Sequence, residues 1–295
     1  MHRVIENCHP FVISIYFILS GILVMYVNHP FFLLSTIIVC IFSNRLFTTW
    51  TTIRKNLLGS LILGGTIILI NSLFNSNGTT EMFVMFGKSF KLETFIYSLV
   101  MAAMIVAILQ LTLLFNATLN GSKFLYVMST LLPKTGLVTM LALRFVPMLK
   151  EQIGEIIAVQ KMRGYSLKEG PLLQRAKTGL LFVQMLLTIS LEDAIQTADS
   201  MKARGYGGET RTSYHFYRWT WHDTSVVLLL SILVILILLF SIKGYGVVAI
   251  YPIVTVDILD TRHALVGVLA LFVIGLPVIL EGLEWCRWRL YNWRT

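Results

Sequence analysis

The chain has 295 residues, of which 56% are apolar and only 13% are charged, and its mean hydropathy is +0.76. Soluble domains are usually about a quarter charged, so this composition excludes an ordinary soluble protein. It predicts an all-α protein that crosses a membrane several times. The formal net charge of +9 is compatible with nucleic acid or anionic lipid, but in a membrane protein excess Lys and Arg first report orientation. The three cysteines are scattered, without disulfide or metal spacing.

Six apolar segments predict about six transmembrane helices. They are Phe11–Val27, Phe31–Ser43, Leu57–Phe74, Thr94–Phe115, Thr224–Ile242 and Ala264–Gly282. The first is too long for a signal peptide and has no small-residue cleavage site after it, so we expect a retained span. The second is short, so a re-entrant segment is an alternative to a span, because extending it to Trp50 requires Asn44 and Arg45 to snorkel. Tyr245–Leu259, which contains a proline, is also ambiguous.

The basic residues predict that both termini are cytoplasmic. If the N-terminus is inside and all six segments cross, the inside loops hold all but four of the 24 Lys and Arg residues. The outside loops hold Lys88, Lys91, Lys243 and Arg262. This asymmetry is typical of a plasma-membrane protein with that orientation. An interfacial belt would follow the last span, formed by Trp285, Trp288, Tyr291 and Trp293.

The chain therefore divides into a transmembrane bundle at 1–115, a cytoplasmic helical region at 116–223 and further transmembrane segments at 224–295. Within the central region, residues 123–147 predict a short amphipathic helix and then another that re-enters or lies on the membrane surface. After Pro147, apolar residues recur with a helical period. Beyond a polar break at Ser166–Pro171, Leu172–Arg204 predicts a helix about 50 Å long.

The same short string ends both long helical patterns. Lys161-Met162-Arg163-Gly164-Tyr165 ends the first, and Lys202-Ala203-Arg204-Gly205-Tyr206 ends the second. In both, Gly follows a basic last turn, so Gly takes the left-handed C′ position and the cation meets the negative end of the helix dipole. Each helix thus presents an Arg at its tip, although two ordinary helix ends would look the same.

The helix over 172–204 also has an apolar face. Its members are Leu180, Leu187, Leu191, Ala194, Ile195, Ala198 and Met201. Packing within the protein is the simpler interpretation for any one of these residues. For the helix ends, contact with a partner is favoured, because an Arg-tipped end gains little from an internal core.

Motifs for chemistry are missing from the sequence. It contains no P-loop and no HExxH, and its six histidines are dispersed. Carboxylates near the spans sit at segment edges, which disfavours a secondary transporter. Asp223, at the start of a span, is most simply an N-cap. These residues indicate a polytopic protein without its own energy source, as expected for a coupling subunit driven by a separate ATPase.

Three sets of residues resemble the EcfT family, called CbiQ in metal systems. Leu143-Arg144-Phe145-Val146-Pro147-Met148-Leu149 followed by Gln160-Lys161-Met162-Arg163-Gly164 resembles its central signature. So does Ala198-Asp199-Ser200-Met201-Lys202-Ala203-Arg204-Gly205-Tyr206 with Arg211-Thr212 behind it, and so do His9-Pro10 and Asn28-His29-Pro30. The similarity covers roughly Cys8–Ile242. The first string departs from the family in having Met162, and the apolar stretch and span after Lys243 are additional.

The resemblance implies the transmembrane coupling component of an energy-coupling factor importer of vitamins or of nickel or cobalt ions. Two ATP-binding-cassette ATPases would bind ATP and Mg, so this chain would be neither an enzyme nor a cofactor carrier. The residues that dock the ATPases would be Met162, Arg163, Gly164, Ala203, Arg204 and Gly205. The membrane-embedded, substrate-binding S component would contact Leu180, Leu187 and Leu191. The family's cargo is selected by the S component, so this sequence does not specify it.

The alternative is a membrane enzyme or scaffold whose basic central region binds anionic lipid. Eight acidic residues accompany the 13 basic ones between Asn116 and Asp223. Such a mixture is typical of helix surfaces and differs from a polybasic lipid-binding run.

Overall fold

The computed structural model describes residues 9–75, 78, 80–85, 88–165, 171–206, 217, 219–246 and 261–282. Its elements are α2 (Pro10–Tyr26), α3 (Pro30–Phe47), α4 (Trp50–Phe74), β1 (Glu81–Met85), β2 (Lys88–Lys91), α5 (Leu92–Thr118), α6 (Gly121–Leu131), α7 (Pro133–Met162), α8 (Leu172–Ala203), α9 (Trp221–Ile242) and α10 (Thr261–Ile274). The prediction of an all-α membrane protein is confirmed, with a small antiparallel hairpin of β1 and β2 added. The predictions for residues 166–170, 211–212, 247–259 and 283–295 lie outside the described residues.

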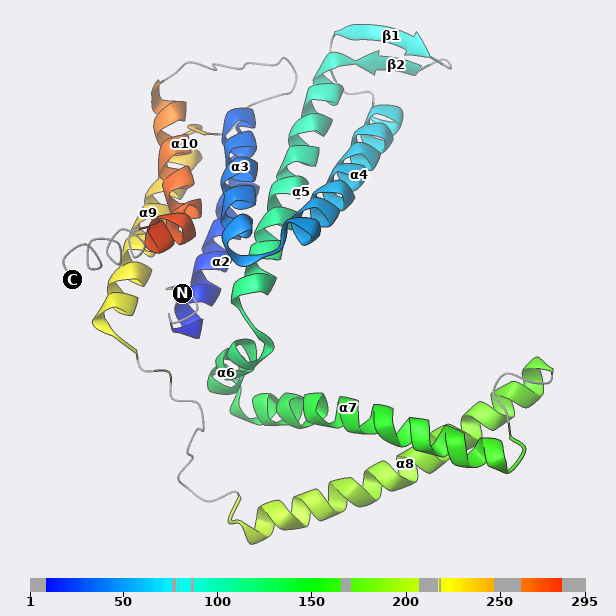
Figure 1. Cartoon of the computed structure of the whole chain (residues 1–295). Helices are drawn as coiled ribbons and strands as arrows, with labels where there is room; N and C mark the ends of the chain where they lie inside the picture. Colours follow the sequence, from blue (N-terminus) through cyan, green and yellow to red (C-terminus); the bar gives the residue numbers. More distant parts are fainter. Residues whose placement is uncertain are drawn as a thin grey trace. The chain divides into compact units, whose positions relative to one another are not determined.

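The chain divides into two compact units. One comprises Met1–Phe124 with Tyr217–Thr295, and the other comprises Leu125–Phe216. The first unit, which we call the bundle, contains α2 to α5, α9 and α10 (Figure 1). The second unit contains α7, α8 and most of α6, and it carries both Arg-tipped helix ends.

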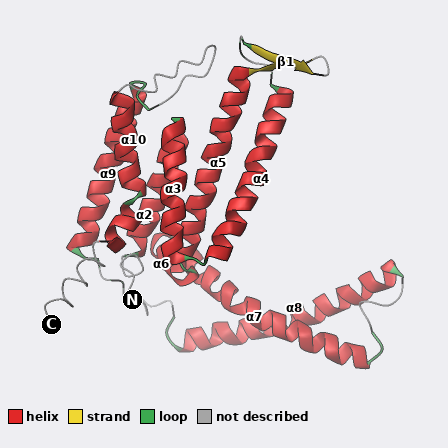
Figure 2. Cartoon of the chain, turned by 45° about the horizontal axis from the view of Figure 1, so that its top comes forward, coloured by secondary structure: helices red, strands yellow, loops and turns green. Residues whose placement is uncertain are grey.

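The number of candidate spans agrees with the sequence, but their identity differs, because α8 was expected to be cytoplasmic and α2 was expected to span. Five helices of the described chain are long and apolar enough to cross a membrane, namely α3, α4, α5, α8 and α9. A sixth candidate is the bent pair of Arg262–Ile274 and Leu276–Gly282, whose parts meet at 57°. Helix α2 is apolar but shorter, with 17 residues. Figure 2 shows the bundle helices in red.

The core of the bundle is formed by α2, α3, α5, α9 and α10. Its most buried side chains include Leu23, Leu33, Leu114, Ile237 and Ile274. Helix α4 packs on α5, where Gly64 faces Ala102. A Cβ at Gly64 would lie 3.4 Å from the Cβ of Ala102, an ordinary van der Waals contact.

The expectation that Asn44 has to snorkel is wrong, because its side chain is fully buried among three helices. Asn44 Nδ2 donates to the main-chain carbonyl of Gln110 on α5 at 2.9 Å. Gln110 Nε2 donates in turn to Oδ1 of Asn56 on α4 at 3.0 Å. A buried amide is tolerated when it finds such partners. Helix α3 therefore continues to Phe47, four residues beyond the predicted segment.

The central region contains fewer helix boundaries than predicted. Helix α6 is the short amphipathic helix, but the separate helix expected after Pro147 is wrong, since α7 runs without interruption from Pro133 through Pro147. Pro147 cannot donate to the Leu143 carbonyl, one turn earlier. Both residues are exposed, so this carbonyl is accessible to other hydrogen-bond donors.

Asp223 is not the N-cap that the sequence suggested. Thr220 is the N-cap of α9, and Asp223 is the third helical residue of a capping box. The Asp223 carboxylate accepts hydrogen bonds from Thr220 N at 2.9 Å and Thr220 Oγ1 at 2.7 Å. It also accepts from His9 N at 3.4 Å, which ties the beginning of α2 to the beginning of α9 within the bundle.

Candidate functional site

The end of α7 is closed by a Schellman motif. Gly164 has a φ of 85°, in the left-handed region that favours glycine. Its N–H donates to the Lys161 carbonyl at 3.1 Å, and Tyr165 N–H donates to the Gln160 carbonyl at 3.0 Å. Arg163 is the C-cap residue. The predicted role of Gly164 is confirmed.

The end of α8 repeats this geometry. Gly205 has a φ of 76°, and its N–H donates to the Lys202 carbonyl at 2.9 Å. Tyr206 N–H donates to the Met201 carbonyl at 2.9 Å, and Arg204 is the C-cap residue. The two strings therefore form the same local structure, with an arginine at the same place in each.

All six residues predicted to dock the ATPases are exposed. They are Met162, Arg163, Gly164, Ala203, Arg204 and Gly205. Met162, which departs from the family's string, is 81% exposed. A large apolar side chain in this position has no packing role within its own helix, and it adds apolar surface beside the arginine.

The string by itself does not identify a docking site, because a third copy of its geometry ends α9. Lys243 is the C-cap residue there, Gly244 has a φ of 89°, and Tyr245 N–H donates to the Phe240 carbonyl at 3.2 Å. Sequence reasoning missed this third basic-Gly-Tyr end. What sets the first two ends apart is their place on α7 and α8, in the second unit.

Helices α7 and α8 cross, and their tips lie at opposite ends of the crossed pair (Figure 1). Gln152 Nε2 donates to Asp193 Oδ2 at 2.9 Å, and Gln160 Nε2 contacts Met185 Sδ at 3.2 Å. As numbers rise along α7 they fall along α8, so the helices run in opposing directions. The crossing lies near Ile156 on α7. At a rise of 1.5 Å per residue, the path from the crossing along α7 to Arg163 and the path along α8 to Arg204 together measure about 30 Å.

The three leucines predicted to contact the S component share one exposed face of α8. Leu180, Leu187 and Leu191 are 71%, 57% and 63% exposed. Their spacing of seven and then four residues places them on one side of a helix. Within the second unit, these three side chains therefore do not pack against α7.

Gln152 and Asp193, which join the two helices, were not recognised from the sequence. Gln152 lies within a stretch of mixed charge, and Asp193 lies among other polar residues of the 172–204 helix. A contact between residues 41 positions apart has no local signal.

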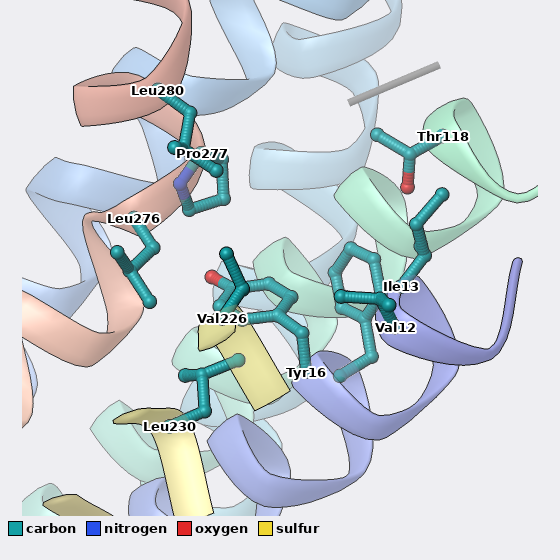
Figure 3. Close-up of a pocket in the computed structure, with 10 residues that line it drawn as sticks. Val12, Ile13, Tyr16, Thr118, Val226, Leu230, Leu276, Pro277 and Leu280 are labelled. Atoms are coloured by element: carbon teal, nitrogen blue, oxygen red, sulfur yellow. The ribbon is translucent and has the colours of Figure 1, made fainter. Parts of the chain in front are cut away.

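The bundle contains a small pocket of about 40 Å³ (Figure 3). Its lining comes mostly from apolar side chains, including Val12, Phe17, Leu230 and Leu276. Tyr16 borders it and donates through its hydroxyl to the Ile274 carbonyl at 2.8 Å. Among the described residues, no three His, Cys, Asp or Glu side chains are grouped to hold a metal ion. The pocket offers few groups that would recognise a polar cargo.

The Tyr16 hydroxyl is expected to stabilise the bend after α10. Gly275 and Pro277 interrupt this helix, and proline removes a main-chain donor. Tyr16→Phe leaves the Ile274 carbonyl without this hydrogen bond, which is expected to lower stability by about 1–3 kcal/mol. Thermal unfolding in detergent measures the change. Tyr26→Phe, on an exposed position of the same helix, is the control, and an equal loss in both variants would contradict the assignment.

Comparisons with known proteins agree with this architecture. The family model for CbiQ, the cobalt transport protein, matches residues 6–214. The energy-coupling factor transporter transmembrane protein EcfT of Bacillus subtilis is 37% identical over 105 residues, 35% of this chain and 39% of the relative. EcfT of Streptococcus equi is 39% identical over 110 residues, 37% of this chain and 40% of the relative.

A third similar protein is EcfT of Lactococcus lactis, which is 36% identical over 107 residues, 36% of this chain and 40% of the relative. The chain thus spans 39–40% of the length of these curated relatives. The relatives are named as transporter components, and the family model covers most of the chain. This multi-pass membrane protein therefore belongs to the EcfT/CbiQ family.

Proposed function

We propose that this chain is the coupling component of an energy-coupling factor importer. In this role it transmits the ATP-driven motion of two ATP-binding-cassette ATPases to a substrate-binding S component, for uptake of a vitamin or a metal ion. The observation that carries the proposal is the pair of exposed arginine tips, closed by the same motif and held at opposite ends of one crossed helix pair. One crossed helix pair with two equivalent ends suits attachment to two similar subunits.

Each arginine docks in an acidic groove of one ATPase. A guanidinium is planar and offers five donors in a fixed fork, which suits bidentate contact with a carboxylate. Met162 and Ala203 precede the two arginines and contribute exposed apolar atoms to the same contacts. The apolar face with Leu180, Leu187 and Leu191 receives the S component. The chain itself catalyses nothing, ATP and Mg bind to the ATPases, and both termini lie in the cytoplasm.

Anionic lipid is the competing partner for the basic second unit. Exposed acids lie among the bases on its helices, including Glu151 and Glu155 on α7 and Glu192 and Asp199 on α8. Repulsion between these carboxylates and anionic headgroups opposes flat binding of either helix. The protein partner is therefore favoured.

Affinity purification in mild detergent tests the proposal. Tagged chain expressed in its own host is expected to carry along two ATPase subunits and one small, very apolar membrane protein. Retention of anionic lipid without ATPase subunits would contradict it and support the lipid-binding alternative.

Lysine is not expected to replace either arginine. Arg163→Lys and Arg204→Lys keep the charge but lose the planar fork, and the loss of a charged hydrogen bond at an interface costs roughly 1.5–3 kcal/mol. Uptake should fall substantially in each variant, while the second tip keeps the complex together. Uptake at the wild-type rate in both variants would show that the tips do not dock through the fork.

A further inference from the structure

Little apolar surface holds α7 against α8. Among the described residues of the two helices, the buried side chains are Ile156 and Gln160 on α7 and Thr178 and Phe182 on α8, and the latter two lie before Met185, away from the crossing. An open groove lies beside them, lined by both helices and including Val159, Leu181, Gln184 and Ile189. A crossing angle is fixed by interlocking side chains, and this interface supplies few. Packing alone therefore defines the angle weakly.

Two side-chain contacts from α7 glutamines supplement this packing. Gln152 Nε2 donates to Asp193 Oδ2 at 2.9 Å, and Gln160 Nε2 contacts Met185 Sδ at 3.2 Å. The contacts are eight residues apart on each helix, or about 12 Å along each axis, and Ile156 lies between them. One contact alone would serve as a pivot, but two contacts at this spacing oppose rotation of one helix over the other.

Gln160 also belongs to the first tip. Its main-chain carbonyl accepts the N–H groups of Tyr165 at 3.0 Å and Arg163 at 3.1 Å. The same residue thus closes the end of α7 and contacts α8 through its side chain. The buried Gln160 therefore links the Arg163 tip to α8.

The side-chain amide of Gln152 is only partly hydrogen-bonded. Its Oε1 atom is buried without a hydrogen-bond partner in the part of the chain that is described. Burying an amide with half of its hydrogen-bonding capacity unused costs free energy that an apolar residue avoids. The contact with Asp193 is the feature of this amide that an apolar residue could not reproduce.

We propose that Gln152 and Gln160 are positioning residues, which hold α7 and α8 at one crossing angle and so present the two arginine tips at a fixed separation. The role of that separation rests on the proposed function, in which each tip docks one ATPase. The two contacts, Gln152 with Asp193 and Gln160 with Met185, lie within this chain and do not depend on any partner. They can therefore be tested on the purified chain.

The test measures a distance between spin labels at Ala142 on α7 and Ala198 on α8, both exposed and both beyond the Gln152 end of the crossing. The full chain is used, with its three native cysteines replaced. Gln152→Glu sets a carboxylate against Asp193. Combining it with Asp193→Asn restores a hydrogen bond, because the Asn amide can donate to the new Glu. Gln196→Glu adds the same charge at an exposed position of α8 and is the control.

The wild-type chain and Gln196→Glu are expected to give one narrow distance distribution. A rotation of about 20°, the usual scatter of helix crossing angles, shifts Ala142, about 20 Å from the crossing, by roughly 7 Å, and Ala198, which lies nearer the crossing, by less. Gln152→Glu should therefore shift or broaden the distribution by several Å, and the double variant should restore the narrow peak. An unchanged distribution in Gln152→Glu, or no recovery in the double variant, would overturn the proposal. Either result leaves ATPase co-purification, and hence the proposed function, untouched.

Discussion

Replacing both tip arginines with glutamate is expected to release the ATPases from the membrane complex. Each of Arg163→Glu and Arg204→Glu sets like charges against an acidic groove, and such contacts cost several kcal/mol at an interface. The single variants should retain part of the complex, because the remaining tip holds the ATPases at high effective concentration. Co-purification of ATPase subunits with the tagged chain measures the loss.

The double variant should still fold and insert. Both helix ends are closed by main-chain hydrogen bonds, which the side-chain change leaves in place. A negative charge at a helix C-terminus costs only about 0.3–1 kcal/mol. The matched control is Lys150→Glu with Lys177→Glu, two exposed cations on the same helices. Equal retention or equal loss of ATPase in the two double variants would contradict docking at the tips.

The second large effect is expected at the corner between α6 and α7. A Cβ at Gly136 would overlap with Ser129 Cα and lie 2.6 Å from Ser129 Cβ, so it would force the two helices apart. Overpacking of this kind costs about 1–3 kcal/mol. Helix α6 follows α5 after two residues, so this corner is one of the two chain connections between the bundle and the tips.

Gly136→Ala should therefore reduce uptake strongly while the ATPases remain attached, because the arginine tips are unchanged. Gly154→Ala is the control on the same helix, since a Cβ there meets no atom within 4 Å. Uptake assays and co-purification on the same membranes separate the two effects. Wild-type uptake by Gly136→Ala would show that transport does not depend on this corner.

The apolar helices and the helix ends were predictable from the sequence because their signals are local. A run of apolar residues defines a span wherever it packs, and the segments predicted at Leu57–Phe74 and Thr94–Phe115 lie within α4 and α5. Likewise, Gly164 and Gly205 end their helices through their own backbone conformation. The two exposed arginine tips could thus be identified in advance.

Features that depend on distant partners were not predictable. The length of α3 depends on Asn44 meeting Gln110, 66 residues away. The crossing of α7 and α8 depends on Gln152 meeting Asp193, and neither residue belongs to a motif. The short basic-Gly-Tyr string also could not identify a docking end by itself, since Lys243-Gly244-Tyr245 closes α9 in the same way.

Photo-crosslinking from the tips tests the central claim most directly. A benzophenone side chain is placed at Met162 or Ala203, each exposed beside its arginine, and at exposed Ala158 of α7 as the control. The membranes are irradiated and the adducts are identified by mass spectrometry. Both tip positions are expected to crosslink to an ATPase subunit, and Ala158 is not. Lipid adducts alone at both tips, or ATPase adducts of equal yield at Ala158, would contradict docking through Arg163 and Arg204.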